Sequence, residues 1–219
     1  MTARPLARVG TVDAVVADLR DRVLSGEIPP GTWLRERELT EEYAVARHSV
    51  RAALRQLAAE RLVRVRPNRG VQVTVLDPAE LRGLYELRAA LETEAARLLV
   101  QRYGVEPLPA AVVEAAERLE GACAGRPLDA EAVDDAHAAL HHALVVAAGS
   151  ARITEAHATL DAETRVYLRQ LRPLMGAEEM ARSHRALLAG LVAEGPEAVR
   201  RHIVGATERL IAETHGRER

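Results

Sequence analysis

The stretch from Leu34 to Leu57 constrains the fold of this chain more than any other segment. Its sequence, LRERELTEEYAVARHSVRAALRQL, predicts two short helices with a tight break between them. Val50, Leu54 and Leu57 recur at spacings of four and three, which gives the second helix one buried stripe. The two helices must therefore pack against something through one face and leave the other face free.

A short polar segment separates the two predicted helices, and cations follow it. Ala46-Arg47-His48-Ser49 is the polar segment, and Arg51 stands a few residues later. Two small helices joined by a tight turn, with cations at the start of the second, are typical of a helix-turn-helix that enters a major groove. An ordinary helical hairpin with a solvated arginine face has the same pattern, so the flanking segments must decide between the two.

The flanking segments extend the helical pair to a winged helix-turn-helix. Residues 11–25 carry one apolar stripe, and Gly26 ends this predicted helix. Residues 62–66 and 71–75 alternate as half-buried strands do, and the turn at 67–70 joins them into a hairpin. Three helices followed by a β-hairpin form a winged helix-turn-helix, in which the hairpin tip can reach the neighbouring groove.

Beyond Asp77 the sequence predicts only helices. Asp77 can cap a helix that Pro78 begins, so we expect a domain boundary between residues 76 and 77. Breakers divide the rest into six predicted helices: 78–103, 108–124, 129–148, 151–171, 178–193 and one from 195–196 almost to the C-terminus. The predicted fold is mainly α, with a winged helix-turn-helix at 1–76 and an all-α helical-bundle ligand-binding domain at 77–219.

Charge is divided between the two predicted domains. Residues 1–76 carry 13 Arg and 9 acidic residues, a net of +4, whereas residues 77–219 carry 17 Arg and 23 acidic residues, a net of −6. This asymmetry indicates that only the first domain approaches a polyanion such as DNA. All 30 basic residues are Arg, which excludes Schiff-base and P-loop lysine chemistry.

Cysteine use and hydropathy favour a cytoplasmic protein with no membrane partner. The lone Cys123 excludes an intramolecular disulfide, which suits a reducing compartment. No apolar run approaches the roughly 20 residues that a membrane-spanning helix needs, and the N-terminal segment lacks a secretory h-region.

Several segments together resemble known regulators. Residues 24–31, 34–39, 46–51, 53–57 and 67–70 resemble the winged helix of the GntR superfamily. The segments that resemble the all-helical FCD effector domain of the FadR subfamily are 84–92, 140–150 and 183–188, and six helices fit its VanR-like branch. The resemblance implies a repressor that binds a pseudo-palindromic operator in double-stranded DNA as a homodimer.

The resemblance also implies which side chains contact the operator. They are Arg37, Arg47, His48, Ser49 and Arg51, with Asn68, Arg69 and Gly70 in the wing. Arginine suits this role because its fork binds guanine O6 and N7 or a phosphate, and a helix N-terminus offers N–H groups to phosphate. The family usually has Ser or Thr where this chain has Ala46, so the contact of that hydroxyl is missing.

Four histidines form a candidate metal site in the second domain. His137 and His141 lie four residues apart on one predicted helix, and His184 and His202 lie beside the apolar stripes of two others. Helical bundles commonly build metal sites from such inward side chains, and Zn²⁺ or Ni²⁺ accepts imidazole. The resemblance implies an Asp at position 137 and, without a gap, a His at Ala206. A degraded site, or an oxygen ligand from Asp134, is therefore an alternative.

Arg88 is the candidate effector-binding residue. With Glu92 four residues on, it matches an Arg-x-x-x-Glu element of the family, and a buried guanidinium suits the carboxylate of a small organic acid. An ion pair that only fixes the bundle is the alternative. We also keep a constitutive regulator as an alternative function. A metal-dependent enzyme is disfavoured, because no His-Glu-x-x-His element or comparable base is present.

Overall fold

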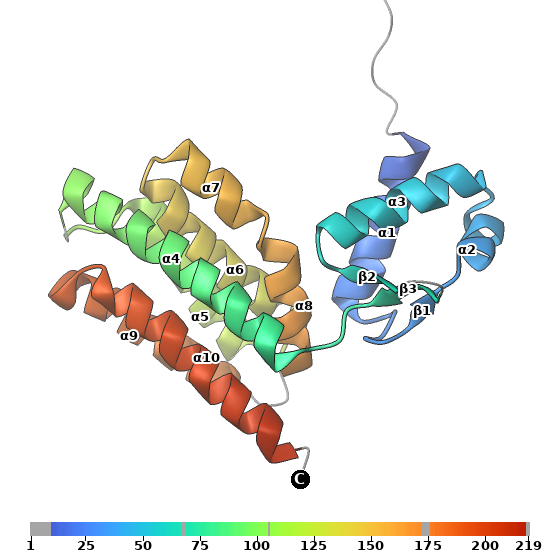
Figure 1. Ribbon diagram of the computed structural model, residues 1–219. Helices are drawn as coiled ribbons and strands as arrows, with labels where there is room; N and C mark the ends of the chain where they lie inside the picture. The colour runs from blue at the N-terminus through green and yellow to red at the C-terminus, as the bar shows by residue number, and fades with distance from the viewer. Residues whose placement is uncertain (1–9, 67–68, 105, 172–175, 218–219) are drawn as a thin grey trace, which may run out of the picture. The chain divides into compact units, whose positions relative to one another are not determined.

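The computed structural model describes residues 10–66, 69–104, 106–171 and 176–217. Its contacts divide the chain into two compact units, Met1–Val75 and Leu76–Arg219. In the described residues the first unit combines three helices with a small sheet, and the second is wholly helical (Figure 1). The predicted fold class is confirmed: a winged helix-turn-helix followed by a helical bundle.

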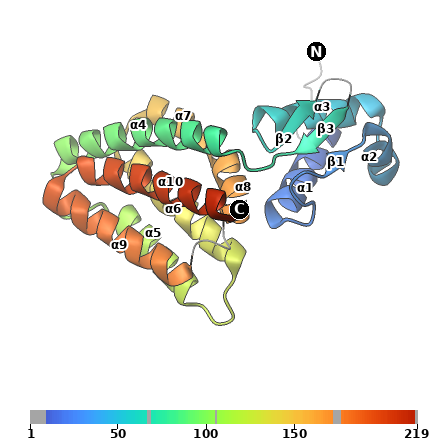
Figure 2. The ribbon, with the colours of Figure 1, turned by 60° about the horizontal axis from the view of Figure 1, so that its bottom comes forward.

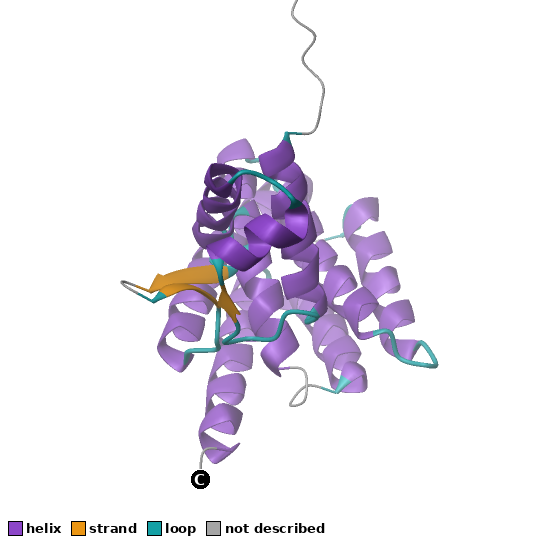
Figure 3. Ribbon diagram, turned by 90° about the vertical axis from the view of Figure 1, so that its right-hand side faces the viewer, coloured by secondary structure: helices purple, strands orange, loops and turns teal. Residues whose placement is uncertain are grey.

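The first unit has the elements of a winged helix-turn-helix. In chain order they are α1 (Thr11–Ser25), β1 (Trp33–Leu34), α2 (Glu36–Tyr43), α3 (Arg47–Ala59), β2 (Val63–Arg66) and β3 (Gly70–Val73). The strands form one antiparallel sheet in the order β1-β3-β2 (Figure 3). Strand β1 was not predicted, because two residues are too few to show an alternating pattern.

The core of the first unit follows the apolar stripes of the sequence. On α1 the buried side chains are Val15, Val16, Leu19 and Val23, and on α3 they include Val50, Leu54 and Leu57. Gly26 ends α1 in the left-handed conformation, with φ 77°, and its amide donates to the Val23 carbonyl. These stripes pack α1 against α3, which fixes the face that α3 leaves free.

The break between α2 and α3 lies at residues 44–46, which is earlier than the predicted break at residues 46–49. Ala44 is left-handed, with φ 50°, and Ala46 is the N-cap of α3. The Ser49 amide donates to the Ala46 carbonyl at 2.9 Å. Arg47, His48 and Ser49 therefore form the first turn of α3, where free N–H groups favour anions.

The second unit is a bundle of long and short helices. They are α4 (Pro78–Tyr103), α5 (Ala110–Ala124), α6 (Ala130–Ala147), α7 (Ala151–Ala158), α8 (Asp161–Leu171), α9 (Ala177–Glu194) and α10 (Glu197–Arg217). Helix α10 packs beside α4 and α9, and α5 beside α6 and α9 (Figure 2). Asp77 caps α4 as predicted, because its Oδ1 accepts from the Ala79 amide at 2.9 Å.

One predicted helix is wrong. Residues 151–171 form two helices, α7 and α8, so the described part of this unit has seven helices instead of six. At the break the Thr159 hydroxyl donates to the Ala156 carbonyl at 2.7 Å, and the Leu160 amide donates to the His157 carbonyl at 2.9 Å. Side-chain and short-range backbone hydrogen bonds produce this break. The sequence therefore carries no signal for it, because neither Gly nor Pro stands there.

Leucine and alanine fill the interior of the bundle. Leu81, Leu99, Leu119, Leu140 and Leu191 are fully buried, and Tyr167 is the largest of the fully buried side chains. This core closes around a polar interior that holds the candidate site. Over the described residues, no helix combines the length and the apolarity that crossing a membrane requires.

Candidate DNA-reading face and histidine-lined cavity

An acidic side chain holds two predicted DNA-contact residues of the first unit. Glu36, the first residue of α2, accepts from Arg47 Nε at 2.9 Å and from Arg51 Nε and Nη2 at 3.1 and 2.9 Å. Both arginine side chains are largely exposed, at 70% and 52%. Hydrogen bonds from Arg51 and Arg47 lower the pKa of Glu36 to about 2, so the carboxylate is charged at any working pH.

The other predicted contacts differ in how much surface they offer. Arg37 and His48 are exposed, and Arg37 Nη1 lies 3.2 Å from Glu41 Oε1. Ser49 is only 7% exposed, so its side chain presents little area to a ligand. Their contact with DNA stays a prediction.

The wing is only partly described. Arg69 and Gly70 are exposed at the start of β3, and Asn68 lies outside the described residues. Gly70 has φ 103°, a conformation that residues with a Cβ rarely adopt. The Arg69 amide donates to the Arg66 carbonyl at 3.0 Å, which closes the hairpin turn. The role of these residues at DNA stays a prediction.

The second unit contains a cavity of about 200 Å³ between its helices. Helix α4 contributes Tyr85 and Arg88, α6 contributes His137 and His141, and α8 contributes Leu168. The remaining lining residues come from α9 and α10: Glu179, Met180, Ser183, His184, His202, Ile203, Ala206, Arg209 and Leu210. All four histidines predicted for the metal site and Arg88 thus meet at one place.

Three of these histidines form a group that can hold a metal ion. His137, His141 and His184 are buried, and each offers a ligand nitrogen within 4.8 Å of the other two. His202 lies beside the group: its ring centroid is 4.6 Å from that of His184, and its Nδ1 is 3.4 Å from Ser183 Oγ. The structure therefore brings three predicted ligands together and places the fourth at their edge.

The hydrogen bonds of His141 and His184 fix how their rings are protonated. His141 Nδ1 lies 2.6 Å from Glu92 Oε2, and His184 Nδ1 lies 2.7 Å from the Met180 carbonyl. The Met180 carbonyl can only accept, and the ionised Glu92 carboxylate also accepts, so each Nδ1 carries a hydrogen. Burial lowers the pKa of both rings, that of His184 to about 3, so both are neutral and each Nε2 keeps a lone pair.

The two lone pairs face each other, which favours a cation between them. His141 Nε2 and His184 Nε2 are 3.2 Å apart. Two nitrogens bound to one tetrahedral Zn²⁺ at ~2.1 Å are separated by roughly 3.4 Å, so this spacing fits one shared ion. His137 supports the same conclusion, because its Nδ1 is buried and has no hydrogen-bond partner within the described part of the chain. These nitrogen donors therefore fit a metal ion that binds imidazole, such as Zn²⁺.

A buried carboxylate positions the histidine group. Glu92 accepts from Arg88 Nε at 2.9 Å, from His141 Nδ1 at 2.6 Å and from His157 Nε2 at 3.2 Å. Burial by itself raises the pKa of Glu92, but the charge of Arg88 and the hydrogen bonds from His141 and His157 outweigh it and hold the pKa well below its usual value. Carboxylate–histidine pairs of this kind orient the rings that bind metals.

Two of the site's polar residues were not identified from the sequence. The sequence pairs Glu92 only with Arg88, and it gives no signal for a role of His157. His157 is buried with its Nδ1 unpartnered among the described residues. It lies on α7, which ends at the unpredicted break, so no apolar stripe showed that its ring points inward.

Comparison with known proteins defines the class of this chain. Residues 11–73 match the family described as bacterial regulatory proteins, gntR family, and residues 83–207 match the FCD domain. The chain therefore belongs to the GntR family of bacterial regulatory proteins, in the group with an FCD domain, as the resemblance predicted. The families and relatives are transcription regulators and not enzymes, which confirms that prediction too.

Individual relatives cover the chain to different extents. It is 30% identical over 199 residues to the transcriptional repressor GlaR of Escherichia coli K12, covering 85% of this chain and 89% of that protein. The gluconate operon transcriptional repressor of Bacillus subtilis 168 is 36% identical over 106 residues, which are 48% of this chain and 43% of that protein. The chain thus spans less than half the length of that repressor.

A solved structure shares the whole architecture. The GntR regulator of Rhodococcus sp. RHA1 superposes with a TM-score of 0.73 at 25% identity, covering 94% of this chain and 97% of that one. Escherichia coli McbR/YncC, at 22% identity and a TM-score of 0.69, has the same fold.

Proposed function

We propose that this protein represses transcription by binding a pseudo-palindromic operator as a homodimer, and that a small organic acid modulates this binding. The observation that carries the proposal is the placement of Arg47 and Arg51 on the first two turns of α3, exposed and held by Glu36. A helix that enters a major groove contacts bases through such N-terminal side chains. Relatives named as repressors support the direction of control.

The sensing part of the proposal rests on the histidine-lined cavity. We assign a divalent metal, Zn²⁺ or Ni²⁺, to His137, His141 and His184, with His202 as a fourth nitrogen donor. Such an ion supplies an electrophilic position for the carboxylate of the effector. Arg88 also lines the cavity. Its Nε donates to Glu92, and the Nη groups of its fork can donate to the same effector carboxylate.

Salt dependence tests the DNA-binding part. The purified protein is titrated into a fluorescent duplex taken from upstream of its own gene, with a shuffled duplex as control. Each phosphate contact contributes a slope of about −0.9 to log affinity against log salt concentration. A steep slope and a preference for the upstream duplex are expected. A flat salt response in both duplexes contradicts DNA reading by the arginine face.

Metal analysis tests the sensing part. We expect about one Zn²⁺ or Ni²⁺ per chain in the purified protein, and loss of that metal in His141→Ala. His142→Ala is the matched control, because His142 is the next residue on α6 but is exposed. Equal metal content in both variants contradicts the assignment.

A constitutive regulator is the second candidate function. Ala206 lines the cavity where the family usually has a histidine, and His137 stands where it has an aspartate. Thermal-shift screening of carboxylic acids separates the candidates. Absence of bound metal, together with no acid that stabilises the protein, favours the constitutive reading.

A further inference from the structure

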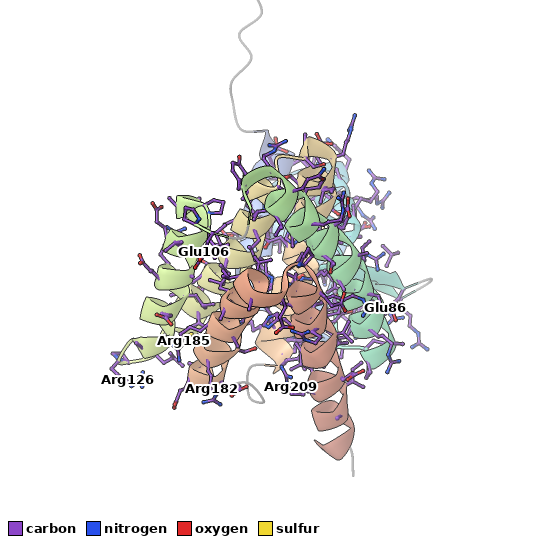
Figure 4. The ribbon with its side chains drawn as sticks, turned by 90° about the vertical axis from the view of Figure 1, so that its left-hand side faces the viewer. Glu86, Glu106, Arg126, Arg182, Arg185 and Arg209 are labelled. Carbon is purple, nitrogen blue, oxygen red and sulfur yellow. The ribbon has the colours of Figure 1, made fainter. Side chains whose placement is uncertain are left out.

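A second arginine, Arg209, lines the cavity besides Arg88, and no acidic side chain that the structure describes pairs with it. Arg209 lies on the exposed side of α10 and makes no ion pair or hydrogen bond with any residue that the structure describes. Figure 4 shows it on the side of α10 that faces α9, with Arg182 across from it on α9. A cation is thus free at the edge of a cavity in an acidic unit.

The neighbouring acid does not neutralise this cation. Glu179 is the only acidic residue among the described residues that line the cavity. Its carboxylate pairs instead with Arg182, three residues further along α9. Arg88, the other cavity arginine, is paired with Glu92. The cavity therefore has one neutralised guanidinium inside and one free guanidinium at its edge.

Small residues on α10 give the Arg209 side chain room over the helix surface. A Cβ on Gly205 would lie 3.5 Å from Arg209 Nη1, which places the guanidinium back along the helix over the preceding turn. Ala206, on that same turn, presents only a methyl group to the cavity. A histidine or a longer side chain at position 206 would compete for this space.

The surface between the two ends of the cavity is mainly apolar. Met180, Ile203 and Leu210 line it, together with the ring of Tyr85. Its volume of about 200 Å³ is below the roughly 300–1,000 Å³ of pockets that hold drug-sized ligands. A short ligand with an apolar middle and an anionic group at each end matches this lining.

We propose that the effector is a short dicarboxylate. One carboxylate lies at the histidine group and Arg88, the methylene chain lies on the apolar lining, and the second carboxylate pairs with Arg209. This inference rests on the proposed sensing function and narrows its ligand class. The second charge-assisted contact is expected to tighten binding about tenfold, which corresponds to about 1.4 kcal/mol and lies near the lower end of the contribution of hydrogen bonds to charged groups.

Calorimetry on the full-length protein loaded with Zn²⁺ tests the proposal. Succinate, glutarate and adipate are compared with butanoate, pentanoate and hexanoate, so that each diacid has a monoacid of equal carbon number. At least one diacid is expected to bind about tenfold more tightly than its monoacid. Arg209→Gln is expected to abolish that preference and to leave the affinity for monoacids unchanged.

Arg200→Gln is the matched control, because Arg200 is an exposed arginine of the same helix that does not line the cavity. It is expected to keep the diacid preference. Monoacids that bind as tightly as diacids overturn this inference alone and leave the proposed function intact. A preference that survives in Arg209→Gln overturns it as well. Binding of neither acid class overturns both the inference and the sensing part of the proposed function.

Discussion

At the scale of single residues, Glu36 links the two arginines that are predicted to contact DNA. Its carboxylate binds Arg47 and Arg51 at the same time, although an acid near DNA repels phosphate. Such a cost is offset when the acid holds the arginine forks in the orientation that reads bases, since bidentate contacts contribute about 1–3 kcal/mol of discrimination each. In the proposed DNA complex, Glu36 would therefore increase sequence specificity at the expense of overall affinity.

Glu36→Gln tests this role. We expect the ratio of operator to random-duplex affinity to fall about tenfold, because a neutral amide with one acceptor oxygen holds the two arginines less firmly than the carboxylate, while random-duplex affinity stays equal or rises. Fluorescence anisotropy with both duplexes measures the ratio. Glu38→Gln removes the same charge from an exposed position on the same helix and serves as the control. An equal change in the two variants would mean that loss of one negative charge, and not loss of the contact with the arginines, explains the effect.

The buried histidines make the stability of the metal-free protein depend on pH. Burial lowers the pKa of His184 to about 3 and that of His202 to about 2, and it also lowers those of His137 and His141. These groups are neutral when folded but take up protons near pH 6.5 when unfolded. Unfolding therefore binds protons below that pH, and stability falls as the pH falls from about 6.5 toward 3.

Urea unfolding of the metal-free protein at pH 7.5, 6.0 and 5.0 measures this dependence. Well below pH 6.5 each buried neutral histidine removes about 1.4 kcal/mol of unfolding free energy per pH unit. His184→Gln should flatten the curve, whereas His142→Gln, at an exposed position, should not. A stability that stays constant down to pH 5 is incompatible with neutral, buried rings.

At the scale of elements, α3 begins without a side-chain cap. Its N-cap, Ala46, accepts the Ser49 amide only through its backbone carbonyl. A hydroxyl at this position would satisfy one more free N–H of the first turn, and N-caps contribute roughly 0.5–2 kcal/mol. The N-terminal turn of α3, which carries Arg47, is thus less stable than it would be with a hydroxyl side chain at the N-cap.

Ala46→Thr is expected to slow hydrogen exchange of the α3 amides by about tenfold relative to the natural chain. Ala46→Val has nearly the same shape without the hydroxyl and is not expected to protect these amides. Hydrogen exchange resolved by residue is the suitable measurement, because two units need not unfold in one step. Equal protection in both variants would assign the effect to packing instead of capping.

Some of the helices and strands could be predicted from the sequence, and others could not. Helix α1 was predicted with its ends, because the apolar stripe of Val15, Leu19 and Val23 and the C-cap at Gly26 are both local signals. Strand β1 and the break at Thr159 were missed, since a two-residue pairing and a side-chain bond to the Ala156 carbonyl leave no periodic signal.

In the candidate sites too, residues with a local sequence signal could be predicted, whereas residues that only packing brings together could not. Histidines at positions 137, 141 and 184 could be assigned to one interior from their place on helix faces. The anchoring carboxylates could not: Glu36 lies 11 residues from Arg47, and Glu92 lies 49 residues from His141. Such contacts depend on how helices pack, and no pattern along the chain records them.

At the scale of the whole molecule, the proposed function requires coupling between the two compact units of the chain. A ligand changes DNA affinity only if it binds the DNA-competent state and the released state with different affinity. Linkage then makes the effect reciprocal: operator DNA must change effector affinity by the same factor. Typical couplings of 1–3 kcal/mol correspond to about 5- to 150-fold.

Two titrations on the Zn²⁺-loaded protein measure this coupling independently. Operator affinity is measured with and without a saturating effector, here the tightest acid of the calorimetric series, and the affinity of that acid is measured with and without saturating operator. For a repressor released by its effector, both affinities are expected to fall by one common factor of at least five. Arg209→Gln should reduce the affinity for diacids yet leave the common factor for a monoacid unchanged, because Arg209 is assigned to ligand contact and not to transmission. An acid that binds the cavity but leaves operator affinity unchanged would separate binding from control and favour constitutive repression.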